Sequence, residues 1–428
     1  MKKIFIFISF GFLMFSSCND ELDLDPKAIL SEDQISTPQD AERFVIAAYS
    51  ELGNDEINRP FSLWPYGNVR SDDAYKGGRD PGDGQHFHFT ETFTNLTPNI
   101  SFFDELWFHL YVGVRRANEG LRIMENFTDD DYPAKQTRIG ELRFIRGHFY
   151  FELKKLFNRI PYLDENTDPA TYKDVTNVEF TIDELWEKIA SDFEFASEVL
   201  PQVQPQVGRA DQIAAFAYLA KTRLASDHAL QSDYANNFLP GPFENGVESV
   251  FAVQFSKDDG TTNGRLNFGD MLTVPQGIGC CDFQKPSQNL VNAFRTDENG
   301  LPLFDTFNQN NVDFANNTVD PRLDHTVSRP GNPWKYQTDL IVEENWSRAP
   351  QIYGTFNSLK ENVSPDDPGF TNVDPFYGNT KTRVILRYAD VMLFKAEALI
   401  ELGQQDQALP LINALRERAA SSTTRLVN

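Results

Sequence analysis

The sequence predicts a mostly α-helical protein made of tetratricopeptide-type helix pairs, with a loop-rich, irregular lobe that carries short strands. Three observations predict this fold class. Apolar residues recur at three- and four-residue steps through much of residues 37–226, as they do on the buried face of a helix. The same pattern returns at about 381–420. Between these two regions, glycine, proline, asparagine and aspartate are dense and the helical period is lost.

Five helices are expected in the N-terminal half. The first has a clear start, because Thr37 can cap it, Pro38 suits the first helical position and Asp40 follows in the first turn. The fourth begins with a capping box formed by Thr181 and Glu184. Together with the apolar periodicity, these signals predict helices over residues 37–53, 101–124, 137–158, 181–200 and 210–226.

One further helix pair is expected near the end of the chain. It covers residues 389–402 and 406–419, with Gly403 in the turn between the two helices. A helix–turn–helix of roughly 34 residues, with small residues where the helices cross, is typical of a tetratricopeptide unit. Ala396 and Ala408 are two of these small residues.

We expect a single domain over residues 37–428. Its helical repeats cover about 37–226 and 381–420, and its irregular lobe covers about 227–380. A β-like run, Ser249–Phe255, lies inside the lobe. Because long structured loops in a compact domain usually carry function, a binding site is expected there.

The first residues are typical of an export signal. Lys2 and Lys3 precede an apolar run over residues 4–15 that is too short to span a bilayer comfortably. Cys18 follows Ser16 and Ser17, as in a bacterial lipobox, where the cysteine is acylated and becomes the mature N-terminus. The sequence thus predicts a signal peptide over residues 1–17, and a lipid anchor with an acidic tether over 18–36. The alternative is an ordinary cleaved signal followed by an incidental cysteine.

The charge of the chain argues against a nucleic-acid partner. The formal net charge is −24, and cleavage after residue 17 would remove two more lysines. An acidic surface repels both phosphate backbones and anionic lipid. Neutral molecules or another protein are therefore the expected partners, and acyl chains on Cys18 would be the contact with the membrane.

The sequence contains no constellation that predicts an enzyme or a cofactor. Phosphate-loop and nucleophile-elbow motifs are absent from it. His86 and His88 would face the same side of a strand and could then hold a metal with a third ligand, but a solvated loop is the favoured interpretation. Residues 80–84, DPGDG, lack the full ligand series of a calcium loop and are expected to form a turn. No metal site is predicted.

Several segments resemble landmarks of the SusD/RagB family of outer-membrane lipoproteins, in family order over nearly the whole chain. They are GELRFIRGHFYFEL at residues 140–153, Ile160-Pro161, Gly208-Arg209-Ala210, Asp320-Pro321-Arg322-Leu323, LRYADVML at 386–393 and NALRERA at 413–419. The stretch 226–251 is short for the family, and the chain ends at Asn428 where relatives usually continue.

This resemblance implies a SusD-like α-α superhelix and a lipid-anchored protein of the outer membrane that faces the cell exterior. It also implies capture of an oligosaccharide or another small nutrient for a SusC-like TonB-dependent transporter. Two alternatives remain open at this point: the same fold could bind peptide or another non-sugar nutrient, or the protein could be a tetratricopeptide scaffold that binds only proteins.

Two groups of residues fit the chemistry of sugar binding. An aromatic ring can cover the apolar face of a pyranose while polar side chains bind its hydroxyls. The candidates are Trp64, Tyr66, Asp72, Asp73 and Tyr75 in the loop after the first helix, and Trp334, Tyr336 and Trp346 in the lobe. Loop packing is the competing interpretation for these rings. Trp107 and Trp186 lie on apolar helical stripes and are expected in the core.

The adjacent cysteines Cys280 and Cys281 have two possible states. A vicinal disulfide would make a rigid apolar knuckle at the ligand pocket, whereas two buried thiols would only fill space. Neither state would cross-link distant parts of the chain, so packing must supply the stability.

Overall fold

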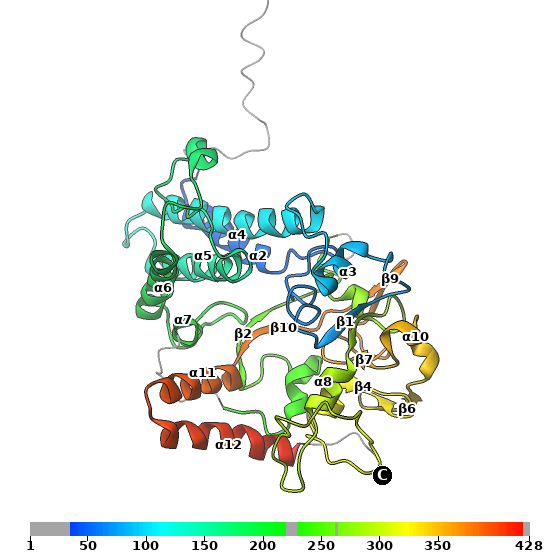
Figure 1. Ribbon diagram of the computed structural model, residues 1–428. Coiled ribbons are helices and arrows are strands. Elements are labelled where there is room, and N and C mark those ends of the chain that lie inside the picture. Colours follow the sequence, from blue (N-terminus) through cyan, green and yellow to red (C-terminus); the bar gives the residue numbers. More distant parts are fainter. Residues whose placement is uncertain (1–34, 220–228, 262–263, 423–428) are drawn as a thin grey trace, which may run out of the picture.

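The computed structural model describes residues 35–219, 229–261 and 264–422. The predicted signal peptide, Cys18 and the end of the fifth predicted helix lie outside this part of the chain. Figure 1 shows a stack of helices on one side, a two-stranded ribbon through the middle, a terminal helix pair below it, and an irregular lobe beside them. The mostly α-helical fold class is confirmed.

The N-terminal helices form where the periodicity and the caps predict them. They are α2 (Pro38–Leu52), α4 (Ser101–Glu125), α5 (Lys135–Phe157), α6 (Ile182–Val199) and α7 (Gln212–Tyr218). Each of these packs on the next, and their apolar stripes share one large core. The capping box is present: Thr181 Oγ1 accepts from the amide of Glu184 at 3.2 Å, and the Glu184 carboxylate accepts from the amide of Thr181 at 2.7 Å.

Small residues let α4 and α5 approach closely. A Cβ at Gly113 would overlap the ring of Phe149, and one at Gly120 would overlap the side chain of Leu142. Glycine weakens a helix by about 1 kcal/mol relative to alanine. At these two positions the close packing of large side chains from α5 outweighs that cost.

The terminal helix pair is also confirmed, as α11 (Tyr388–Glu401) and α12 (Gln405–Ser421). Gly403, with φ of +72°, makes the turn between them. Glycine adopts this left-handed conformation without steric cost.

A central ribbon joins the two halves of the chain. β2 (Ser249–Val253) pairs antiparallel with β10 (Arg383–Arg387), which leads directly into α11. The predicted β-like run at 249–255 is therefore a strand, although it ends two residues early. Its partner could not be predicted, because the two strands are far apart in sequence.

The lobe contains short elements from two parts of the chain. β1 (Ala74–Gly77) pairs antiparallel with β3 (Phe283–Pro286), so the segment between α2 and α4 lies against the lobe. The remaining helices are α3 (Gln85–Thr92), α8 (Gln288–Ala293), α9 (Leu323–Thr326) and α10 (Pro350–Tyr353). The other strands are β4 (Val327–Ser328), β5 (Pro333–Trp334), β6 (Gln337–Ile341), β7 (Asn357–Ser358), β8 (Thr371–Val373) and β9 (Phe376–Gly378).

His86 and His88 lie on the helix α3 and not on a strand. Neighbours two positions apart point to different sides of a helix, so these rings do not face a common metal. Among the described residues, no group of three or more histidine, cysteine or acidic side chains is arranged to hold a metal ion. The described helices also include none that is both long and apolar enough to cross a bilayer.

Buried His148 makes the stability of the protein depend on pH. It lies on α5 with Nδ1 2.6 Å from the hydroxyl of Tyr218, and burial lowers its pKa to about 3. In the unfolded chain the pKa is about 6.5. Between these two pKa values the imidazole is protonated in the unfolded state and neutral in the folded state. The contribution of His148 to the free energy of unfolding therefore falls as the pH drops, by up to about 1.4 kcal/mol per pH unit.

We therefore expect His148→Gln to reduce the slope of stability against pH between about pH 6.5 and 4. Urea unfolding at several pH values measures both slopes. Burial raises the pKa of Asp55 to about 6, so Asp55 makes stability rise as the pH drops. This effect is the same in the wild type and the variant and cancels in the comparison. Parallel curves for the two proteins would contradict the assignment.

Candidate functional site

The first predicted aromatic residue, Trp64, belongs to the core. Its side chain is 2% exposed, its indole N–H donates to the carbonyl of Gly269 at 3.2 Å, and its ring centroid lies 4.9 Å from that of Phe87. The expectation of an exposed ring at this position is wrong. The segment after α2 folds against the lobe, and a large apolar ring there gains more from burial than from exposure to water.

The tryptophans predicted in the lobe are also buried. Trp334 is 0% exposed and Trp346 is 5% exposed, and their ring centroids lie 5.5 Å apart. With Val342 and Leu359 they form a small core of their own. The expectation that these two rings face a ligand is therefore wrong as well.

These buried rings support the loop that carries the two cysteines. On one side of the loop, a Cβ at Gly277 would overlap the indole of Trp346. The amide of Gln276 also donates to the Trp346 carbonyl at 3.0 Å. On the other side, Cys281 packs into the same core cluster as Trp64. Residues from both predicted groups, Trp64 and Trp346, thus pack against the disulfide loop and support it.

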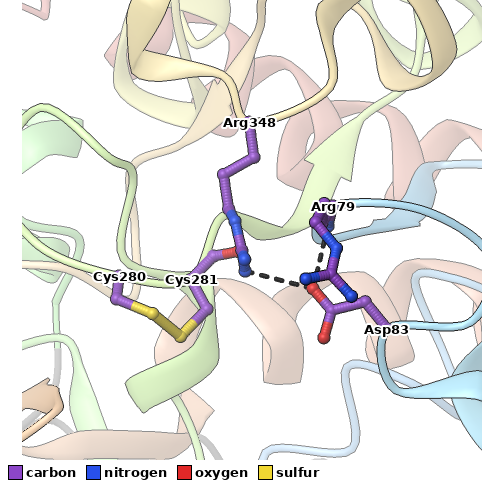
Figure 2. The surroundings of a disulfide bond; sticks show 5 residues. All are labelled: Arg79, Asp83, Cys280, Cys281 and Arg348. Atoms are coloured by element: carbon purple, nitrogen blue, oxygen red, sulfur yellow. Dashed lines mark hydrogen bonds and ion pairs between the residues drawn. A yellow bond between two sulfur atoms is a disulfide. The ribbon is translucent and has the colours of Figure 1, made fainter.

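Cys280 and Cys281 form a disulfide bond, one of the two states considered from the sequence. Cys281 is buried, whereas Cys280 is partly exposed. The bond therefore presents an apolar edge of the loop towards the surface. Figure 2 shows that Arg348 and Asp83 lie next to it.

Arg348 connects the disulfide loop to the segment after β1. Its Nη1 donates to Asp83 Oδ2 at 3.1 Å and to the carbonyl of Cys281 at 3.2 Å, while its backbone amide donates to Asp282 Oδ2 at 2.7 Å. The side chains of Arg348 and Asp83 are 24% and 26% exposed. Both groups are therefore held in place by the interactions drawn in Figure 2 and are still partly exposed.

Lys76 fixes the backbone of the turn that carries Asp83. The Lys76 ammonium is buried and donates to the carbonyls of Asp80, at 2.7 Å, and Asp83. Burial lowers the pKa of Lys76 to about 8. Residues 80–84 form the predicted turn, and Arg79 projects from its start with a side chain that is 69% exposed.

Three predicted residues near the start of the chain have structural contacts. The ring of Tyr66 stacks on Phe102, with centroids 5.7 Å apart. Asp72 is exposed and Asp73 is partly buried. The backbone carbonyls of both accept hydrogen bonds from Ser287, so this segment is fixed against the lobe through its main chain.

The other two predicted tyrosines lie apart. Tyr75, on β1, is partly exposed and its ring lies 6.2 Å from that of Tyr353. Tyr336 is 38% exposed, and its hydroxyl lies 3.3 Å from Nδ1 of His325. Tyr336 is thus the one predicted ring of the lobe group that reaches the surface.

We define the disulfide face as Arg79, Asp83, Cys280, Cys281 and Arg348 (Figure 2). Guanidinium groups donate hydrogen bonds, a carboxylate accepts them, and the disulfide offers an apolar surface. This combination suits a ligand with hydroxyl groups around an apolar ring. The two cysteines of this face could be proposed from the sequence as an edge of a ligand pocket, but their neighbours could not, because Arg348 and Asp83 are 265 positions apart.

The tryptophans on the helical stripes have different environments. Trp107 is partly buried and packs against the main core. Trp186 is 37% exposed, so its expected core position is wrong. Its ring instead lies on the surface of α6, 5.6 Å from the ring of Phe151 and below the ammonium of Lys154.

Comparison with known proteins finds two family models that match in succession. The model described as starch-binding associating with outer membrane matches residues 84–224, and the model described as SusD family matches residues 247–427. SusD-like protein P25 of Formosa agariphila is 24% identical, with 99% of this chain and 83% of that protein covered. SusD-like protein P2 of the same organism is 25% identical, over 98% and 82% of the two chains.

Solved structures agree on the fold. A SusD superfamily protein from Bacteroides vulgatus aligns with a TM-score of 0.67 and 21% identity, over 90% of this chain and 80% of that one. A SusD-like carbohydrate binding protein from Bacteroides fragilis has a TM-score of 0.69 and 20% identity, over 92% and 80%. Together the two family models span most of the chain. The chain belongs to the SusD/RagB family.

The family landmarks in this SusD-family protein are mainly packing positions. Gly140 and Gly147 on α5 meet side chains of α6, where a Cβ would overlap Val199 and press against Phe193. In the Asp320–Leu323 landmark, Arg322 donates two hydrogen bonds to the Asp320 carboxylate, at 2.9 and 2.6 Å. The landmarks therefore identify the SusD fold without marking where this protein binds a ligand.

Proposed function

We propose that this protein is a cell-surface lipoprotein that binds a glycan and delivers it to a SusC-like TonB-dependent transporter of the outer membrane. The observation that carries the proposal is the disulfide face, which presents hydrogen-bonding groups beside an apolar edge on a SusD fold. Sugars are recognised by this combination of contacts.

Solved relatives support a glycan as the ligand. One structure that shares the fold is described as a laminarin binding SusD-like protein, with a TM-score of 0.66 and 18% identity. Another is surface glycan-binding protein A from Bacteroides thetaiotaomicron in complex with laminarihexaose, with a TM-score of 0.62 and 17% identity. At this identity the fold is shared and the particular glycan is not implied.

The charges at the disulfide face favour binding over catalysis. A general acid in glycoside hydrolysis needs a raised pKa. At this face, Arg79 lowers the pKa of the exposed Asp80 carboxyl. The Asp83 carboxylate accepts through Oδ2 from Arg348 and from the backbone amide of Arg79, at 2.9 Å, so its role at this face is that of a hydrogen-bond acceptor.

A glycan panel that includes laminarin and starch tests the binding proposal. Arg79→Ala removes an exposed donor from the face, and we expect it to weaken binding of the recognised glycan by roughly tenfold. Arg115→Ala is the matched control, since Arg115 is also exposed and paired with a nearby acid, Glu119. Isothermal titration calorimetry measures both variants. Silence of the wild type across the whole panel would favour peptide binding or a protein scaffold.

The anchor and the transporter need a separate test in the native cell envelope. We expect wild-type protein to incorporate labelled palmitate and Cys18→Ser to lose it. A large outer-membrane barrel protein should co-purify with the wild type. Palmitate incorporation that does not depend on Cys18, or the absence of any barrel protein from the purified material, would contradict these parts of the proposal.

A further inference from the structure

A cavity lies away from the disulfide face, between the helical stack and the lobe. Its volume is about 360 Å³, within the range of small-molecule sites. One wall is apolar and includes Leu110 and Phe149 of the helices and Phe238 of the 3₁₀ helix η3 (Tyr234–Phe238). None of the residues of the disulfide face contributes to its lining.

The lining also carries charged side chains, five of them basic and three acidic. In a chain with 63 acidic and 39 basic residues, basic side chains outnumber acidic ones in this lining: Lys155, Lys360, Lys381, Arg383 and Arg387 against Glu152, Asp270 and Glu361. Three of the basic residues are already paired, and the first two pairs are Arg383 with Asp55 and Arg387 with Asp390. Lys155 pairs with Glu152 at 2.6 Å, on the same helix.

Lys381 has no such partner. Within the described part of the chain, its ammonium has no hydrogen bond and no ion pair. Burial lowers its pKa, and the charges of Asp270 and Glu361 only partly oppose that shift. Asp270 and Glu361 also line the cavity, but Asp270 Oδ1 and Glu361 Oε2 are buried atoms without a hydrogen-bond partner among the described residues.

Lys360 adds positive charge beside the apolar wall. Its ammonium lies 4.8 Å from the ring centroid of Phe238 and 5.6 Å from that of Tyr234. Burial alone would raise the pKa of Tyr234, but Lys360 and Arg387 lower it below its usual value. Lys360 therefore places a positive charge beside these two rings.

We propose that this cavity binds a small organic anion, a sugar of about one residue that carries a carboxylate or a sulfate ester. The anionic group would pair with Lys381 and Lys360, and the ring would pack on the apolar wall formed by Leu110, Phe149 and Phe238. An ammonium that is partly withdrawn from water and has no partner is costly, and an anionic ligand relieves that cost. The proposal concerns a site distinct from the disulfide face and does not depend on the glycan bound there.

Calorimetric titration with D-glucuronate, D-glucose 6-sulfate and D-glucose tests the proposal on the whole protein. We expect at least one of the two anions to bind, and glucose to bind at least tenfold more weakly. Binding of glucuronate alone identifies the group as a carboxylate, and binding of the sulfate ester alone identifies it as a sulfate. Equal affinity for glucose and both anions, or no binding of either anion, would overturn the proposal.

Variants locate the binding. Lys381→Met should weaken the binding of the recognised anion by roughly tenfold. Glu361→Gln should strengthen the binding, because this substitution removes a negative charge from the lining that would repel the anion. Lys173→Met is the matched control, since Lys173 is exposed on a short 3₁₀ turn outside the cavity, and it should leave the affinity unchanged. If Lys381→Met fails to fold, Lys360→Met replaces it. Binding that is unaffected by both Lys381→Met and Glu361→Gln would place the anion elsewhere and overturn the proposal.

Discussion

Asp192→Ala is expected to lower the free energy of unfolding by about 3–5 kcal/mol. Asp192 on α6 and Arg146 on α5 are both buried and share two hydrogen bonds, at 2.8 and 2.7 Å. Arg146 also donates to Asn118 at 2.8 Å and to Glu165. Removing Asp192 leaves a buried guanidinium with one carboxylate partner, and the cost of its burial is no longer offset. Urea unfolding measures the change.

An exposed ion pair supplies the control for this prediction. Arg115 and Glu119 on α4 lie 2.7 Å apart, but their side chains are 51% and 32% exposed. Water already solvates such a pair, so Glu119→Ala should cost no more than about 0.5 kcal/mol. A loss below about 1 kcal/mol for Asp192→Ala would show that water reaches Arg146 and would contradict its buried position.

Trp334→Ala is expected to destabilise the protein by about 3–5 kcal/mol. The indole is 0% exposed and packs against Trp346, Val342 and Leu359. Removing it leaves a cavity in a small core that supports the disulfide loop through Trp346 and Gly277. Thermal and urea unfolding measure the effect. Any loss of glycan binding in this variant should accompany the loss of packing and should not reflect a missing contact with the ligand.

Variants of two exposed residues distinguish a loss of packing from the loss of a contact with the ligand. Trp186→Ala also removes an indole, but one that is 37% exposed, so its cost should be clearly smaller. Tyr336→Ala removes the exposed ring beside β6 and should leave stability within about 1 kcal/mol. If Trp334→Ala were as stable as Tyr336→Ala while glycan binding was lost, Trp334 would have to contact the ligand after all.

The helices could be predicted from the sequence because their signals are local. Thr181 and Glu184 cap a helix from positions three residues apart, and apolar residues repeat within each turn. The same locality identified the turn at residues 80–84. The adjacent cysteines could be identified as a possible disulfide for the same reason, although their oxidation could not be decided from the sequence.

The candidate site could not be predicted in the same way. Aromatic residues in polar loops suggested exposed rings, but Trp64, Trp334 and Trp346 are buried. Exposure depends on what packs over a side chain, and for Trp64 that includes residues of the lobe more than 200 positions away. A sequence window contains no information about that contact.

The sequence by itself determined the helical elements, their order and the family landmarks, since capping, periodicity and close-packing glycines act between neighbouring residues or along one helix face. Only the tertiary structure decided which side chains reach the surface. It brought Arg348 to Asp83 and placed the disulfide loop against two buried clusters that contain tryptophan. It also placed Lys381, whose ammonium has no partner among the described residues, beside a cavity. These features depend on contacts between distant segments, and burial, charge pairing and cavity shape exist only once those segments have packed together.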